Sequence, residues 1–289
     1  MMKNAKSGWF KAGAAVLLVL MGVLAFWGGP SAVGRAQEGE SLYPISDYGW
    51  LTYYMHEVWW RYNDAKLAFD RGDMALAESN LIVMEIFAEV SKDKLPETLQ
   101  DGRPFNQQEY IGKVDELKSY SVQIRKNLKQ KKWADTPADK PDPLLATCVG
   151  CHASYNIPTD FRLDTPFKKL THIMHEIYEL YKQAGVLFMK GESSGDESNY
   201  DLARHCFLAL RPYIEQIKKN IPDQNQLGEP IDKKLFEDAQ SELKKYNEDM
   251  IKKLETKYWR TGKPLPPPRI VVDTCYACHD KVVKIDPPW

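Results

Sequence analysis

The sequence predicts an all-α protein built as two tandem antiparallel four-helix bundles. Three observations predict this fold: an internal repeat that covers most of the chain, apolar residues at the three-and-four spacing of helices, and no stretch with the alternating pattern of strands. The expected organisation is an N-terminal segment over residues 1–36, a first domain over residues 42–160 and a second over residues 164–289.

The N-terminal segment has the features of an export signal. Lys3, Lys6 and Lys11 form a basic region, residues 12–27 form an uncharged apolar run, and residues 34–36 end in small residues that a signal peptidase prefers. An uncleaved membrane anchor is the alternative, because the run is slightly long for a cleaved signal and slightly short for a comfortable span. We therefore expect the rest of the chain to be periplasmic or otherwise extracytoplasmic.

The two halves match segment by segment. Residues 55–58 (MHEV) match residues 174–177 (MHEI) at an offset of 119 residues. After an insertion near Glu192 the offset becomes 126, and Trp133 then matches Trp259. Chance similarity between two helical segments would not reproduce the glycine, proline and tryptophan positions, so the chain is a tandem duplication.

Each half is expected to contain four helices. In the second half, the first helix shows an apolar face from Leu170 to Phe188, and Gly191 is expected to end it. Second helices are expected over about residues 74–91 and 200–220, third helices over about residues 106–132 and 233–258. A proline-rich stretch and a short fourth helix then close each half.

The fourth helices carry the pattern Cys-x-x-Cys-His, at residues 148–152 and 275–279, which uses four of the five cysteines. In this pattern two thiols bind one porphyrin covalently, and the adjacent histidine is the proximal iron ligand. A structural zinc site would need a further ligand pair, and a dithiol redox pair would not need the following histidine. We therefore predict two covalently bound c-type haems. Their attachment residues and proximal ligands are Cys148, Cys151, His152, Cys275, Cys278 and His279. The fifth cysteine, Cys206, is expected to be a small buried residue.

A helical bundle with this motif close to its C-terminus resembles the class II cytochromes c, the cytochrome c-prime family. Further resemblances are residues 190–191 (KG) near the end of the first helix, residues 200–203 (YDLA) at the start of the second, and residues 221–222 (IP) at its end. The resemblance covers residues 45–285, once in each half. The family commonly forms homodimers through its first two helices, so the resemblance implies a covalent version of that dimer and leaves a homo-oligomer open.

The resemblance also locates the sixth coordination position of each iron. In the family it faces a residue of the first helix, and an apolar residue there leaves the iron five-coordinate and able to bind small gases. Counting back from the glycine near the helix end gives His56 and His175, which match one another in the repeat. Met55 and Met174 are the alternative, because they also recur and Met174 lies in the middle of the apolar face. An open position is the third possibility.

These residues predict an electron carrier rather than an enzyme, with redox proteins as partners. The alternative is a gas-binding or catalytic haem protein with at least one five-coordinate iron. Residues 1–36 hold four basic and no acidic residues, which leaves a net charge of −5 for the rest of the chain. This sign argues against a nucleic acid as the partner.

Overall fold

The computed structural model describes residues 47–93, 95–99, 101–133, 142–155, 166–224, 228–262 and 265. All of them belong to one compact unit, Ile45–Trp289. Within this part of the chain the structure is all-helical, with seven α-helices and no strand, so the predicted all-α class is confirmed. None of the helices described is long and apolar enough to cross a membrane. The predicted export signal at residues 1–36 lies outside the described residues.

The first half holds four α-helices: α2 (Asp47–Asp70), α3 (Met74–Val90), α4 (Gln107–Leu128) and α5 (Pro143–Tyr155). A short 3-10 helix, Ser91–Asp93, follows α3. The starts of α3 and α4 are fixed by side chains that cap free backbone N–H groups, as short polar residues do at helix N-termini. The two cap bonds are Leu76 N to Asp73 Oδ1 and Glu109 N to Asn106 Oδ1.

The second half repeats this order with α6 (Pro166–Ser194), α7 (Ser198–Gln216) and α8 (Lys233–Glu255). Short 3-10 helices follow α7 at Lys218–Asn220 and α8 at Tyr258–Thr261. The boundaries of the second and third helices lie within four residues of those predicted from the sequence. The segment equivalent to α5 lies outside the described residues.

One predicted helix end is wrong, since α6 continues past Gly191 by three residues to Ser194. Gly191 is helical, and a Cβ atom added to it would lie 2.9 Å from a ring carbon of Tyr200. The glycine therefore permits close packing of the Tyr200 ring on the helix, and it does not end the helix.

The loops between the second and third helices show the duplication directly. An isolated bridge joins Thr98 to Pro104 in the first half, and another joins Gln224 to Pro230, 126 residues later. Gly102 and Gly228, also 126 residues apart, both have φ of 80°. A residue with a side chain rarely adopts this φ, so both halves need glycine at this point of the loop.

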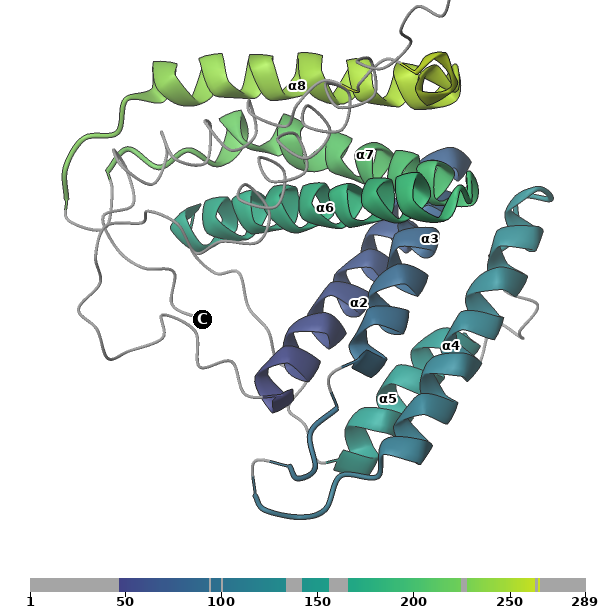
Figure 1. The fold of residues 1–289 in the computed structure, drawn as a ribbon. Helices are drawn as coiled ribbons and strands as arrows, with labels where there is room; N and C mark the ends of the chain where they lie inside the picture. The colour runs from purple at the N-terminus through teal and green to yellow at the C-terminus, as the bar shows by residue number, and fades with distance from the viewer. Residues whose placement is uncertain are drawn as a thin grey trace, which may run out of the picture. The chain divides into compact units, whose positions relative to one another are not determined.

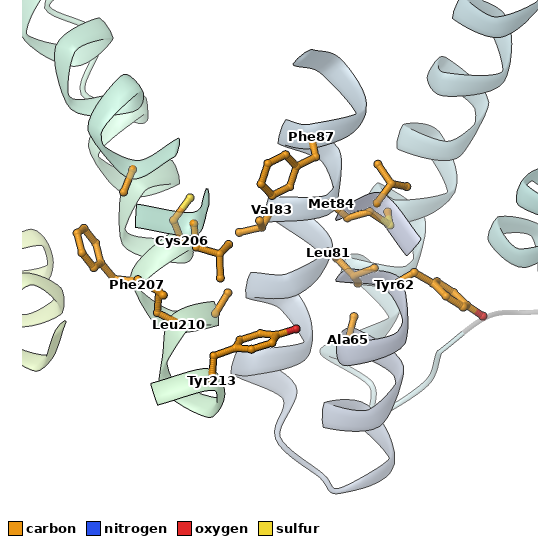
Figure 2. Packing of buried hydrophobic residues seen from close by; sticks show 14 of the residues in the cluster. Tyr62, Ala65, Leu81, Val83, Met84, Phe87, Cys206, Phe207, Leu210 and Tyr213 are labelled. Atoms are coloured by element: carbon orange, nitrogen blue, oxygen red, sulfur yellow. The ribbon is translucent and has the colours of Figure 1, made fainter. Parts of the chain in front are cut away.

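The helices pack as neighbouring pairs, α2 with α3 and α6 with α7, and α3 also packs against α7 (Figure 1). Figure 2 shows the contact between α3 and α7, where Val83 and Phe87 face Cys206 and Leu210. All four side chains are at least 97% buried. Burial of a side chain of this size stabilises a fold by about 1.5–3 kcal/mol, so this contact is a substantial part of the core. It joins the first half of the chain to the second.

Candidate functional site

The first Cys-x-x-Cys-His motif lies on α5, where its spacing of three and four residues puts both cysteines and the histidine on one face of the helix. Cys148 is buried, whereas Val149, between the two cysteines, has 57% of its surface exposed. The helix therefore turns Cys148 towards the protein interior. The side chains of the other motif residues lie outside the described part: Cys151, His152, Cys275, Cys278 and His279.

One face of α2 is directed towards α4 and the segment that follows it. Met55, Tyr62 and Phe69 share this face because they are seven residues, or two helical turns, apart. The hydroxyl of Tyr110 on α4 donates to Met55 Sδ at 3.0 Å. The rings of Tyr62 and Phe69 pack against Trp133, with centroids 6.1 and 5.4 Å away. The methionine named as the alternative iron ligand is thus on the interior face of α2.

The same face recurs on α6 with Met174, Tyr181 and Phe188, each 119 residues after its counterpart. Met174 is partly buried and packs against the core. The ring of Tyr181 lies 6.4 Å from that of Tyr246 on α8, and the ring of Phe188 lies 6.2 Å from that of Phe207 on α7. Both halves therefore place a methionine and two aromatic rings on the interior face of their first helix.

The two histidines predicted as distal ligands lie in different surroundings. His56 is exposed, and Trp59 one turn later is also 38% exposed. His175 has only 16% of its side chain exposed, and its Nε2 atom lies 3.4 Å from Glu57 Oε1 on α2. Its ring stands edge-on to Tyr53 of α2, with centroids 5.3 Å apart. The structure gives no equivalent site to the pair, and their role as iron ligands stays a prediction.

Arg61 on α2 is the centre of a buried polar cluster that joins the two halves. Its guanidinium is fully buried, and Nη2 donates to the Glu176 carboxylate on α6 and, at 2.6 Å, to the Tyr213 hydroxyl on α7. The Tyr213 hydroxyl in turn donates to Asp64 Oδ2 on α2 at 2.5 Å. Glu57, one turn before Arg61, is also buried. We call these five residues the junction cluster.

Burial controls the ionisation of the junction cluster. It raises the pKa of Glu57 to about 7, although the charge of Arg61 opposes this shift. It raises the pKa of Glu176 well above its usual range, with the charge of Glu57 as a second cause. Burial lowers the pKa of the neighbouring His175. Burial therefore disfavours the ionised form of both Glu57 and Glu176, and the charge of Arg61 opposes this effect.

Two further groups on α7 lie between the halves. Nδ1 of His205 is 3.0 Å from Oγ of Ser79 on α3, and these two residues are equivalent in the repeat, 126 residues apart. Contact between equivalent positions is what a twofold axis between two subunits produces. The next residue, Cys206, is completely buried, as predicted, and burial raises the pKa of its thiol to about 12.

The residues of the first half fit a covalently attached haem. Two cysteines and a histidine lie on one helix, Cys148 is buried, and Met55 lies on the interior face of α2, where its sulfur accepts a hydrogen bond from Tyr110. In the described ranges, no group of three or more His, Cys, Asp and Glu side chains could hold a metal ion. No protein-family model, curated protein or solved structure matches the chain. The resemblance to class II cytochromes c therefore depends on the motifs and the helical repeat.

The sequence analysis did not identify the junction cluster. Its signal is visible in the repeat, because Arg61 occupies the position where the second half has Leu180, in the middle of an apolar face. Glu57 and Glu176 are a second signal, since each directly follows a repeated histidine and both are buried. An unpaired charge is rarely buried, so these residues predict a partner from another element.

Proposed function

We propose that the protein is an exported c-type cytochrome that transfers electrons through two covalently attached, six-coordinate haems. The observation that carries the proposal is the repeated Cys-x-x-Cys-His motif, whose first copy lies on α5 with Cys148 buried. Tyr62 binds Asp142, the residue before α5, and lies on the same α2 face as Met55. A covalent haem requires two thiols and an adjacent histidine in this spacing, and α5 carries all three residues.

The architecture proposed for this function is a pair of tandem four-helix bundles, over residues 42–160 and 164–289. In the first half, α2 packs against α3, α3 against α4, and α4 against α5. In the second half, α6 packs against α7 and α7 against α8. By the repeat, the second Cys-x-x-Cys-His motif belongs to a fourth helix that completes this bundle.

The chain's own residues perform three tasks in this proposal. The four motif cysteines hold the two porphyrins, and His152 and His279 bind the irons on the proximal side. The aromatic faces of α2 and α6 exclude water from the haem surroundings, which raises the reduction potential. The haem supplies a one-electron couple, which redox partner proteins outside the cytoplasm reduce and oxidise.

The sixth ligand has two candidate pairs. The repeat alignment supports His56 and His175, whereas the position of Met55 on the interior face, beside Tyr110, supports methionine in the first half. Either pair gives six-coordinate iron and electron transfer. Methionine ligation would raise the reduction potential relative to bis-histidine ligation, so the choice sets the partners that the protein can serve.

The test is haem content and coordination in the protein matured with its haems. Two haems should resist acid-acetone extraction, and both irons should be low-spin and unreactive with carbon monoxide. If His175 is the sixth ligand, His175→Ala should convert half of the sites to a high-spin form that binds carbon monoxide, and Met174→Ala should not. If Met174 is the ligand, the two variants should behave the other way round. Extractable haem would exclude covalent attachment, and a wild-type protein that binds carbon monoxide at both irons would favour gas binding.

A further inference from the structure

Asp142 starts the helix that carries the first haem motif. Its carbonyl oxygen accepts the first helical hydrogen bond, from Ala146 N at 2.9 Å, and its Oδ1 atom accepts from Leu145 N at 2.8 Å. Pro143 occupies the first helical position, where its missing N–H is not needed. Asp142 is therefore the N-cap of α5.

The second carboxylate oxygen of Asp142 is bound by two other elements. Oδ2 accepts from the Tyr62 hydroxyl on α2 at 2.5 Å and from Trp133 Nε1, beyond the end of α4, at 3.2 Å. Tyr62 and Trp133 are 5% and 8% exposed, so water competes little for these bonds. One carboxylate thus connects α2, the end of α4 and the start of α5. We call Asp142, Tyr62 and Trp133 the Asp142 latch.

The latch lies close to the haem attachment site. Cys148 stands six residues after Asp142 along the chain, on the helix that Asp142 starts. Tyr62 also shares the interior face of α2 with Met55, two turns before it. The latch therefore fixes the distance between the helix that attaches the haem and the helix that offers the sixth ligand.

The sequence gives the second half a different residue at the position of this acceptor. Tyr181 and Trp259 are the equivalents of Tyr62 and Trp133, but the position equivalent to Asp142, counted from the matched motif cysteines, is Arg269. A guanidinium has no acceptor atom and cannot take the place of the carboxylate. Trp259 instead stacks on Tyr200, with ring centroids 4.4 Å apart.

We propose that the Asp142 latch positions the haem-motif helix of the first half, and that the second haem is held without such a latch. This inference rests on the proposed haem attachment, but the latch itself consists of contacts within the chain. Asp142, Tyr62 and Trp133 are positioning residues, because they act on the haem through α5. The two haems should consequently respond differently to changes at these three positions.

The test separates capping from latching in the full-length protein with its haems. Asp142→Ser keeps a side-chain oxygen for the N-cap but cannot reach both Tyr62 and Trp133, whereas Asp142→Ala removes both functions. Tyr62→Phe removes one hydroxyl only, and Tyr181→Phe is its matched control in the second half. Hydrogen exchange of Pro143–Tyr155 reports on α5, and a potentiometric titration with electron paramagnetic resonance reports on each haem.

We expect Asp142→Ala, Asp142→Ser and Tyr62→Phe to accelerate exchange in α5 by roughly tenfold, fivefold and fivefold. The same variants should shift the reduction potential or the resonance of the first haem and leave those of the second haem unchanged. Tyr181→Phe should not shift the potential or the resonance of the first haem. The proposal is overturned if Asp142→Ser behaves like the wild type, or if both haems shift together. A protein that carries no covalent haem would refute the proposed function, and the exchange data would still decide whether the latch fixes α5.

Discussion

Replacing Arg61 by leucine should destabilise the protein more than any exposed ion-pair substitution. Arg61 is fully buried and donates to Glu176 and Tyr213 of the second half and, at 3.4 Å, to Asn80 of α3. Leucine is the residue that the second half has at the equivalent position, Leu180, so its size suits this face of the helix. The variant therefore removes the cation without a large change in packing.

The expected loss follows from the charges that remain. Removing one partner of a buried ion pair typically costs about 3–5 kcal/mol, because the other charge is left in a medium of low dielectric constant. Here Glu57 and Glu176 would both remain buried without their cation. Protonation of these carboxyl groups limits the cost, so the loss should be greatest at high pH. Replacing both Arg61 and Glu176 by leucine should recover part of the loss, since apolar residues can replace a buried pair at little cost but Glu57 stays buried without a cation.

Urea unfolding of the full-length protein with its haems, followed by circular dichroism at 222 nm, measures this loss. The matched control is Arg211→Leu, because Arg211 makes two hydrogen bonds to Glu248, at 2.9 and 2.7 Å, on the exposed surface. Exposed pairs contribute about 0–1 kcal/mol, so the control should change little. Equal effects at Arg61 and Arg211 would refute the argument that the junction cluster is buried and essential.

Three further predictions concern single residues. Burial lowers the pKa of His205 to about 4, whereas the unfolded chain binds this proton near pH 6.5. The free energy of unfolding should therefore fall as the pH is lowered from 6.5 to 4. In urea titrations, His205→Asn should make this fall smaller. Gly191→Ala should lower stability by about 1–2 kcal/mol in the same assay, because the new Cβ would lie 2.9 Å from the Tyr200 ring. The control Gly112→Ala has no atom within 4 Å of the new Cβ and should raise stability by up to about 1 kcal/mol. Iodoacetamide should label no thiol in the native protein, because Cys206 is buried and the other four cysteines carry haem. After unfolding it should label only Cys206. Five labelled thiols would contradict the haem attachment.

The helices could be predicted from the sequence because their signals are local. Apolar residues at helical spacing and polar caps such as Asp73 and Asn106 act within a few residues, so the helices could be located from the sequence with their ends within four residues. The prediction failed at Gly191, where the requirement for glycine comes from Tyr200, a residue of the next helix. A contact between helices has no local signal, and the same glycine could end a helix elsewhere.

The candidate site was only partly predictable for the same reason. The haem motif is a contiguous pattern, so Cys148 and its neighbours could be named from the sequence alone. The repeat then paired His56 with His175, but the structure surrounds them differently, because His56 faces solvent and His175 faces Glu57. Sequence equivalence predicts equal surroundings only when the same elements pack around both positions.

The junction explains why equivalent residues of the two halves have different surroundings. At a symmetric interface, equivalent residues of the two sides make equivalent contacts. Ser79 of α3 and His205 of α7 are equivalent in the repeat and contact each other, which is close to this arrangement. Arg61 breaks this symmetry, since Leu180 at the equivalent position supplies no second cation for the paired carboxyl groups. Arg61 of α2 pairs with Glu176 of α6, whereas Glu57 of α2 lies beside His175 of α6, so the two equivalent glutamates have different partners. A duplicated chain can fix such an asymmetric arrangement, whereas a homodimer of identical subunits would have to place two arginines there.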